Sequence, residues 1–128
     1  MIKLNFAHLC EYAFILNNNT PGIIGIFSKI TSKSKPVIRD NIAVILNINP
    51  NDTDEHIVRI VLKSPSGSET LNPIEGEIGP AYNKDQSLGL IINIQNIKLE
   101  EEGVYNIEIF VDEKRIETLS FTFEVEKT

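Results

Sequence analysis

The stretch that decides the fold is residues 104–125, which read VYNIEIFVDEKRIETLSFTFEV. Large apolar side chains occupy every second position in both halves of this stretch, and most positions between them are polar. A period of two places one set of side chains against a core and the other toward water, as in a β-strand. The polar residues 112–114 separate the two halves and indicate a turn. The sequence therefore predicts two strands in this part of the chain.

The same alternation recurs toward the N-terminus, in residues 42–48, 58–62 and 90–94. These runs are rich in Ile and Val, whose branched side chains favour a pleated surface, and turn-forming residues separate them. We therefore predict one all-β domain over residues 1–128, an antiparallel two-sheet sandwich of about eight strands. The expected core consists of Phe27, Val44, Leu46, Ile60, Leu62, Ile92, Ile94, Tyr105, Ile107, Ile109, Leu119, Phe121 and Phe123.

Residues 99–107, LEEEGVYNI, lead into one of these strands through an acidic turn and a glycine. The pattern resembles the corner before strand F of immunoglobulin-like domains, where a tyrosine hydroxyl bonds back to upstream backbone. The resemblance implies that Tyr105 makes such a bond. Antibody domains also carry a cysteine two residues after this tyrosine and a core tryptophan. Here Ile107 takes the cysteine position and the chain has no Trp, so the resemblance is to the immunoglobulin-like architecture alone.

The start of the chain is open to two interpretations. The apolar residues of segment 4–15 fit either one face of a helix or one face of a strand, and periodicity alone does not decide between them. Residues 22–30 read as a strand, and the intervening segment 18–22, NNTPG, suits the turn of a hairpin. We therefore favour a strand, a turn and a second strand.

Several short motifs also resemble an uncharacterised bacterial family of small immunoglobulin-like β-sandwich proteins, a domain of unknown function. They are Phe6–Ala13 (FAHLCEYA), Ile24–Phe27 (IGIF), Gly103–Ile107 and Phe121–Val125. The similarity covers most of the chain, but the motifs are short and mainly apolar. The resemblance implies the fold and favours a strand over residues 6–15. It supplies no activity, cofactor or catalytic residue.

Charge and composition exclude several classes of function. The net charge is −6, and a protein binds nucleic acid mainly by neutralising phosphates with Lys and Arg, so we expect no nucleic-acid partner. No apolar run is long enough for a transmembrane helix, and Met1–Phe6 does not resemble a signal peptide. The single cysteine, Cys10, cannot form an internal disulfide. We expect a cytoplasmic protein that does not bind membranes.

Few side chains have the spacing that catalysis requires. His8 and Cys10 would share one face of a strand, but a nucleophilic thiol also needs a group that orients the histidine, and Glu11 would lie on the other face. The apolar neighbours of Cys10 favour a buried, protonated thiol. We therefore expect a non-catalytic protein with no catalytic residue. A thiol enzyme that uses Cys10 and His8 is a remote alternative.

Metal ligands are equally sparse. One Cys and two His do not make a closed zinc site. The segment Asn49–Glu55 is rich in the oxygen ligands that calcium prefers, but it lacks the spacing of an EF-hand loop. Because Asn and Asp are also ordinary turn formers, we favour a solvated loop there. We expect no metal and no other cofactor.

The predicted function is a non-catalytic protein-interaction or structural module, with an unknown protein partner or a second copy of itself. Binding would use loops or the edge of a sheet. The alternative is a β-sandwich that binds a small ligand or carbohydrate, with Tyr82 as the first contact to test. Two charged segments are further candidates: the basic, hydroxyl-rich segment 28–39 and the acidic run Glu100–Glu102. We favour a flexible connection for the first and a solvated turn for the second.

An outward apolar patch is also possible. Ile91, Val104 and Phe110 interrupt the alternation on the outward side of their strands. If strands 88–97 and 104–111 were neighbours, the three side chains would cluster on the surface, and such a cluster usually marks an interface. The alternative is that residues 76–83 fold over them.

Overall fold

The computed structural model describes residues 2–17 and 20–127, and within them it contains nine strands and no helix. The strands are β1 (Lys3–Ile15), β2 (Pro21–Ile26), β3 (Lys29–Ser32), β4 (Val37–Asn49), β5 (His56–Lys63), β6 (Ile74–Ile78), β7 (Leu88–Leu99), β8 (Gly103–Val111) and β9 (Lys114–Val125). These residues therefore include no apolar helix of membrane-spanning length. The all-β prediction is confirmed, with nine strands where about eight were expected.

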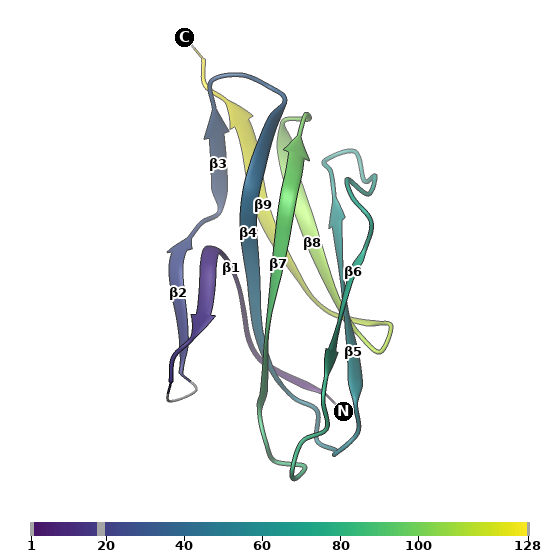
Figure 1. Cartoon of the computed structure of the whole chain (residues 1–128). Helices are drawn as coiled ribbons and strands as arrows, with labels where there is room; N and C mark the ends of the chain where they lie inside the picture. Colours follow the sequence, from purple (N-terminus) through teal and green to yellow (C-terminus); the bar gives the residue numbers. More distant parts are fainter. Residues whose placement is uncertain (1, 18–19, 128) are drawn as a thin grey trace.

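The strands form two sheets that enclose one core (Figure 1). Sheet A has the order β2-β1-β4-β7, and sheet B has the order β3-β9-β8-β5-β6. In the immunoglobulin scheme, β5, β8 and β9 take the places of strands C, F and G, and β4 and β7 those of B and E. The fold is an immunoglobulin-like β-sandwich, as predicted.

One strand pair departs from the predicted antiparallel arrangement. β3 runs parallel to β9, from the pair Lys29–Thr122 to the pair Ser32–Val125. The cause is the way the chain changes sheets: β2 lies in sheet A, and the chain continues in the same direction into β3 at the edge of sheet B (Figure 1). Sheet B is therefore mixed.

The core follows the predicted alternation. All of the predicted core side chains are buried except Phe27 and Leu119, and these two are half-buried against the same cluster. Ile42, Ile94 and Phe123 are among the side chains with no exposed surface. Residues two apart on each strand thus point into the space between the sheets.

β1 pairs with two different strands along its length. Lys3–Cys10 pairs with β4, and Cys10–Ile15 pairs with β2. The second part of β1 turns back on itself, so that it and β2 form a hairpin beside sheet A (Figure 1). A hydrogen bond from Leu16 N to Thr20 O, 2.9 Å, lies next to the turn. The predicted strand–turn–strand is confirmed, and Asn18 and Asn19 of the predicted turn lie outside the described residues. The predicted strand 22–30 is not continuous: β2 ends at Ile26, and β3 begins at Lys29 in the other sheet.

The predicted tyrosine corner is present. The Tyr105 hydroxyl donates to the carbonyl oxygen of Glu101 at 2.8 Å and accepts from its backbone N–H at 3.3 Å. The ring of Tyr105 is 1% exposed and stacks on Phe121, with 5.1 Å between the ring centroids. The corner thereby holds the acidic turn between β7 and β8 against the core.

The prediction of an apolar patch around Ile91, Val104 and Phe110 is wrong. β7 lies in sheet A and β8 in sheet B, so Ile91 is on one side of the sandwich and the other two residues are on the opposite side. Phe110 lies under the guanidinium of Arg59, 5.1 Å from its ring centroid. Alternation identifies the faces of a strand but not its neighbours. The alternative, that residues 76–83 fold over these side chains, is also wrong, because residues 74–78 form strand β6 at the edge of sheet B.

The Tyr105→Phe variant should lose about 1–2 kcal/mol of unfolding free energy, because the Glu101 carbonyl loses its donor while the stacked ring remains. Urea unfolding measures the difference. Tyr82→Phe is the control, since the Tyr82 side chain is 94% exposed and its hydroxyl should contribute little. Equal stability of both variants would contradict a structural role for the corner.

Candidate functional site

Exposed apolar side chains are concentrated in the β1–β2 hairpin. Among the described residues, ten large apolar side chains are exposed, and six of them lie between Tyr12 and Ile26. A cluster of this kind on one segment is typical of an interaction surface, whereas single exposed apolar residues are common. The hairpin is therefore the leading candidate site.

Four of these side chains share one face of the hairpin. Tyr12 lies opposite Ile24, and Phe14 lies opposite Gly22, so Tyr12, Phe14, Ile24 and Ile26 point to the same side. They are 58%, 40%, 54% and 66% exposed, respectively. We call these four residues the hairpin face. A Cβ at Gly22 would overlap the Phe14 ring, so the absence of a side chain there lets the ring lie against the strand.

The hairpin face is also free of charge. Residues 12–28 include no Asp, Glu, Lys or Arg. The charged residues on either side of this segment are paired within the chain: Glu11 with Arg39 at 3.3 Å, and Lys29 with Glu124 at 2.6 Å. This segment therefore offers no side chain for an ionic contact.

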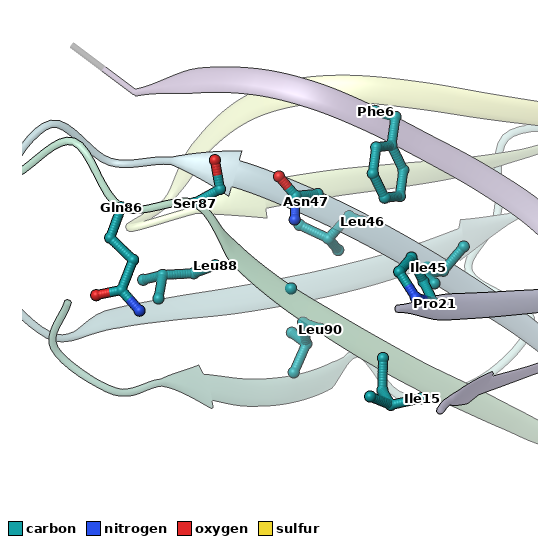
Figure 2. A pocket seen from close by; sticks show the side chains of 11 residues that line it. Phe6, Ile15, Pro21, Ile45, Leu46, Asn47, Gln86, Ser87, Leu88 and Leu90 are labelled. Carbon is teal, nitrogen blue, oxygen red and sulfur yellow. The ribbon is translucent and has the colours of Figure 1, made fainter. Parts of the chain in front are cut away.

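The opposite face of the hairpin turns toward sheet A and helps to enclose a cavity of about 400 Å³ (Figure 2). Ile15 and Pro21 come from the hairpin, and Phe6 and Ile45 come from β1 and β4. The remaining lining residues are Leu46, Asn47, Gln86, Ser87, Leu88, Gly89 and Leu90. None of these side chains is charged, so the cavity suits a neutral group.

Polar groups lie along one side of the cavity. The Asn5 amide donates to Asn47 Oδ1 at 2.8 Å and to Ser87 Oγ at 3.2 Å. The acceptor oxygen of Asn47 is thus engaged. Its Nδ2 donor lies beside Gly89, 3.8 Å from the position that a Cβ would take there. The cavity therefore combines apolar walls with an amide donor.

The geometry of His8 and Cys10 does not resemble a catalytic pair. Both residues lie on the same face of β1, as predicted, and they pair with Ile45 and Ala43 of β4. Cys10 is fully buried, and its Sγ lies 3.6 Å from the Ala43 carbonyl oxygen. Burial raises the pKa of the Cys10 thiol. The His8 ring stacks on Phe6, with 5.6 Å between the ring centroids. The thiol is therefore protonated at neutral pH and closed off from solvent.

The segment Asn49–Glu55, considered above for calcium, is held by His56. Nε2 of His56 lies 2.8 Å from Asp52 Oδ1, and Nδ1 contacts the carboxylate of Asp112. The His56 side chain is 6% exposed. An imidazolium donates through both ring nitrogens, so this arrangement suits the charged form. Sequence analysis missed the cluster, because Asp112 lies 56 residues away and no spacing rule connects it to His56.

The two carboxylates change the acidity of His56. Burial alone would lower the pKa of His56, but hydrogen bonds to Asp112 and Asp52 outweigh it and leave the pKa above its ordinary value of 6.5. The hydrogen bonds with His56 lower the pKa of both carboxyl groups below 3.8. The three groups therefore attract each other most strongly when His56 is protonated and both acids are ionised.

The two charged segments singled out in the sequence are largely engaged in contacts within the chain. In the basic segment, Lys35 pairs with Glu102 at 3.6 Å. In the acidic run, Glu102 also accepts from Val125 N at 2.7 Å, and Glu101 accepts from Ser66 Oγ at 3.0 Å. Tyr82 projects into solvent. These contacts make the acidic run a structural element of the corner.

Replacing His56 with Gln should cost most stability near about pH 5.5, where His56 is charged and both acids are ionised. The contribution of His56 is complete below 6.5 and is lost as pH rises through its raised pKa. The contributions of Asp52 and Asp112 are present above 3.8 and are lost as pH falls through their lowered pKa values. Urea unfolding of wild type and variant at several pH values measures the gap between their free energies of unfolding. It should narrow toward about pH 9.

His8→Gln is the control for this prediction, because the His8 side chain is exposed and stacks on Phe6 instead of bridging two acids. It should keep the pH dependence of the wild type. A constant gap between wild type and His56→Gln from acidic to alkaline pH would contradict the predicted role of the charged imidazole.

Comparison with known proteins identifies the fold and the family. No curated protein is similar in sequence to this chain. An alkylpurine DNA glycosylase from Pseudomonas fluorescens, solved with DNA containing an abasic site analog, is similar at a TM-score of 0.59 and 7% identity, over 96% of this chain and 30% of that chain. The C-terminal domain of Wzt is similar at a TM-score of 0.55 and 11% identity, over 99% of this chain and 74% of that chain.

An immunoglobulin-like protein from Pseudomonas aeruginosa is also similar, at a TM-score of 0.49 and 8% identity, over 97% of both chains. At such identities, a structural likeness concerns the fold and not the activity. The sequence comparison confirms the resemblance to a family without an assigned function. Its profile matches residues 5–124, and the chain accordingly belongs to the family of unknown function DUF6941.

Proposed function

We propose that this chain is a non-catalytic protein-interaction module that binds its partner through the hairpin face. The observation that carries the proposal is the grouping of Tyr12, Phe14, Ile24 and Ile26 on one side of an uncharged hairpin. Exposing large apolar side chains to water is unfavourable, and burying them against a partner removes that cost. The buried, protonated Cys10 thiol supports a role without nucleophilic chemistry.

Docking on the face suits this hairpin better than strand addition at its edge. Along an antiparallel ladder, residue pairs that are hydrogen-bonded to each other alternate with pairs whose backbone groups point outward. Leu16 and Thr20 are hydrogen-bonded, so the next pair along the hairpin, Ile15 and Pro21, is of the second kind. We therefore expect the backbone groups of Pro21, Ile23 and Gly25 to face the open edge of β2. Pro21 has no N–H, and Gly25 has a φ of 74°, outside the extended region. The edge thus offers few regular backbone partners, and proteins commonly protect edge strands in this way.

The double variant Ile24→Ser/Ile26→Ser should lose the protein partner that the wild-type chain retains. Affinity capture from a lysate of the source organism, with the bound proteins identified by mass spectrometry, measures the loss. Both side chains are more than half exposed, so their replacement should leave the fold intact. The loss follows from the removal of apolar contact area at the centre of the interface.

A matched control is available on the other sheet. Ile57 and Val104 are each 49% exposed on β5 and β8, and Ile57→Ser/Val104→Ser should retain the same proteins as the wild type. Capture of identical proteins by all three chains, or loss of capture in the control variant alone, would contradict docking through the hairpin face.

A second candidate function is the binding of a small neutral ligand, and the cavity beneath the hairpin favours it. Apolar walls from Phe6, Ile15 and Ile45 suit an apolar body, and Asn47 Nδ2 suits one acceptor oxygen on that ligand. A cavity of about 400 Å³ lies within the size range of small-molecule sites. The uncharged lining favours a neutral aromatic or acyl compound over an ion.

The Gly89→Leu variant should fill this cavity and abolish binding of such a ligand. A Cβ at Gly89 would meet Asn47 and Leu46 only at ordinary contact distances of 3.8 and 3.9 Å, so the fold should be retained. Benzamide, a neutral aromatic amide, serves as the probe in an NMR titration. We expect it to shift the amide signals of Ile45 and Gly89 in the wild type, and the Ile45 signal should no longer respond in the variant.

The control for this titration is Gly79→Ala, because a Cβ at Gly79 would meet no heavy atom within 4 Å. This variant should bind benzamide as the wild type does. The absence of shifts around the cavity in the wild type would rule out the second candidate, as would an unchanged response in Gly89→Leu.

A further inference from the structure

We propose that the open edge of β7 binds an extended segment of a partner protein, which adds one strand to sheet A. β7 is the last strand of this sheet, at the opposite edge from the β1–β2 hairpin. The site is therefore independent of the hairpin face. The observations that carry the inference are a vacant strand position, a row of backbone groups without partners and the chemistry of the side chains beside them.

One strand of the immunoglobulin scheme has no counterpart here. In that scheme, strand D lies beside strand E at the edge of the sheet. β7 takes the place of strand E, and among the described residues it pairs with β4 alone. Residues 79–87, which lead into β7, form no strand. β6 of sheet B approaches the first residues of β7 (Figure 1), where a Cβ at Gly76 would lie 3.6 Å from Leu90. The vacant position therefore lies beside residues 91–95.

The backbone of β7 presents a regular row of groups to this vacant position. Ile94 and its partner Ile42 on β4 have no exposed surface, and buried backbone groups are almost always paired, so these two residues bond to each other. Because bonded pairs alternate along an antiparallel ladder, we expect the N–H and C=O groups of Ile91, Asn93 and Gln95 to point away from β4. An added strand would supply partners for all of them.

The other sheet edges carry features that prevent strand addition. β2 contains Pro21 and the irregular Gly25, β3 has four residues, and β6 has five and carries Glu75 and Glu77. β7 is 12 residues long and has no proline and no charged side chain before Lys98. Proteins commonly protect edge strands by short length, charge or proline, so an unprotected edge of this length favours a binding role.

The side chains of β7 define the chemistry of the added segment. On the inner face, Ile92 and Ile94 are 6% and 0% exposed, so a strand beside them needs apolar side chains on that face. On the outer face, Asn93 and Gln95 are exposed and uncharged, and they favour polar, uncharged neighbours. The segment therefore alternates apolar and uncharged polar residues, and it runs antiparallel to β7, as strand D does to strand E.

A blocked nine-residue peptide that alternates Thr and Val between terminal lysines serves as the probe for the full wild-type chain. NMR measures the hydrogen exchange of the backbone amides with and without it. At a peptide concentration about ten times the dissociation constant, the amides of Ile91, Asn93 and Gln95 should exchange about tenfold more slowly than in the free chain. Those of Ile92 and Ile94 should exchange slowly in both samples, because they bond to β4.

N-methylation of the peptide separates backbone pairing from side-chain contact. In an antiparallel pair, directly opposite residues that bond to each other also have their side chains on the same face. The Thr residues of the peptide, on the face of Asn93, should therefore bond to β7. A peptide with an N-methyl group on its central Thr should give no protection, whereas the same group on the neighbouring Val should leave protection intact. Equal protection by both peptides would contradict the predicted pairing.

Asn93→Pro tests the same edge on the chain. The variant removes an N–H that points away from β4, so it should fold, as urea unfolding can check, and the peptide should no longer protect Ile91. Asn93→Thr keeps the N–H and should respond as the wild type does. If Asn93→Pro does not fold, the two methylated peptides still decide the question on the wild-type chain.

Two results would overturn the proposal. One is unchanged exchange of the Ile91, Asn93 and Gln95 amides up to about 5 mM peptide. The other is protection of these amides in the free chain that rises with its own concentration, which would assign the edge to a second copy. Neither result bears on the hairpin face, because the variants at Ile24 and Ile26 that test it leave β7 unchanged.

Discussion

The hydrogen bond between the Tyr105 hydroxyl and the Glu101 carbonyl fixes the place where the chain passes from sheet A to sheet B. By fixing the acidic turn, it also positions the carboxylate of Glu102, which binds the backbone of Val125 and the ammonium of Lys35. One buried hydroxyl thus organises the turn before β8, the end of β9 and the loop before β4. The corner bond joins residues only four apart in the chain, so it fixes this turn, whereas the two sheets are held together by the core that they share.

A second constraint acts on β4, which is buried on both faces. Its inner side chains face the core, whereas Ala43 and Ile45 on the outer face are 0% and 2% exposed. Ile45 lies beneath the hairpin, with Ile15 and Pro21 lining the same cavity. The apolar run of residues 42–46, IAVIL, therefore serves two contacts at once. The hairpin is the edge of sheet A, and its strands and the adjoining turn carry six exposed apolar side chains, four of them on the hairpin face.

Local chemistry predicted much of the fold. Alternation identified the strands and the core, and the turn before Tyr105 identified the immunoglobulin-like corner, because both signals depend on residues close together in the sequence. The neighbours of β7 and β8, the parallel pairing of β3, and the contact of His56 with Asp112 were not predictable in this way. Each depends on how distant segments come together, and a single sequence has no periodic signal for that.

The candidate site shows the same limit. Tyr12 and Phe14 alternate as core residues do, and alternation alone does not separate an apolar face turned to water from one turned inward. The difference arises because β1 leaves β4 after Cys10 and pairs with β2 alone. The uncharged composition of residues 12–28 was the available clue, since ordinary solvent-facing strands carry polar residues at alternate positions.

The proposed function would place the two faces of the hairpin under different selection. Positions 15 and 21 line the cavity that the hairpin shares with β4, so mutation there is limited by the shape of that cavity and can be compensated within one gene. Under the proposed function, positions 12, 14, 24 and 26 are limited instead by the partner that binds the hairpin face. The amino-acid sequences of family members should therefore differ more at one set of alternate positions of this hairpin than at the other.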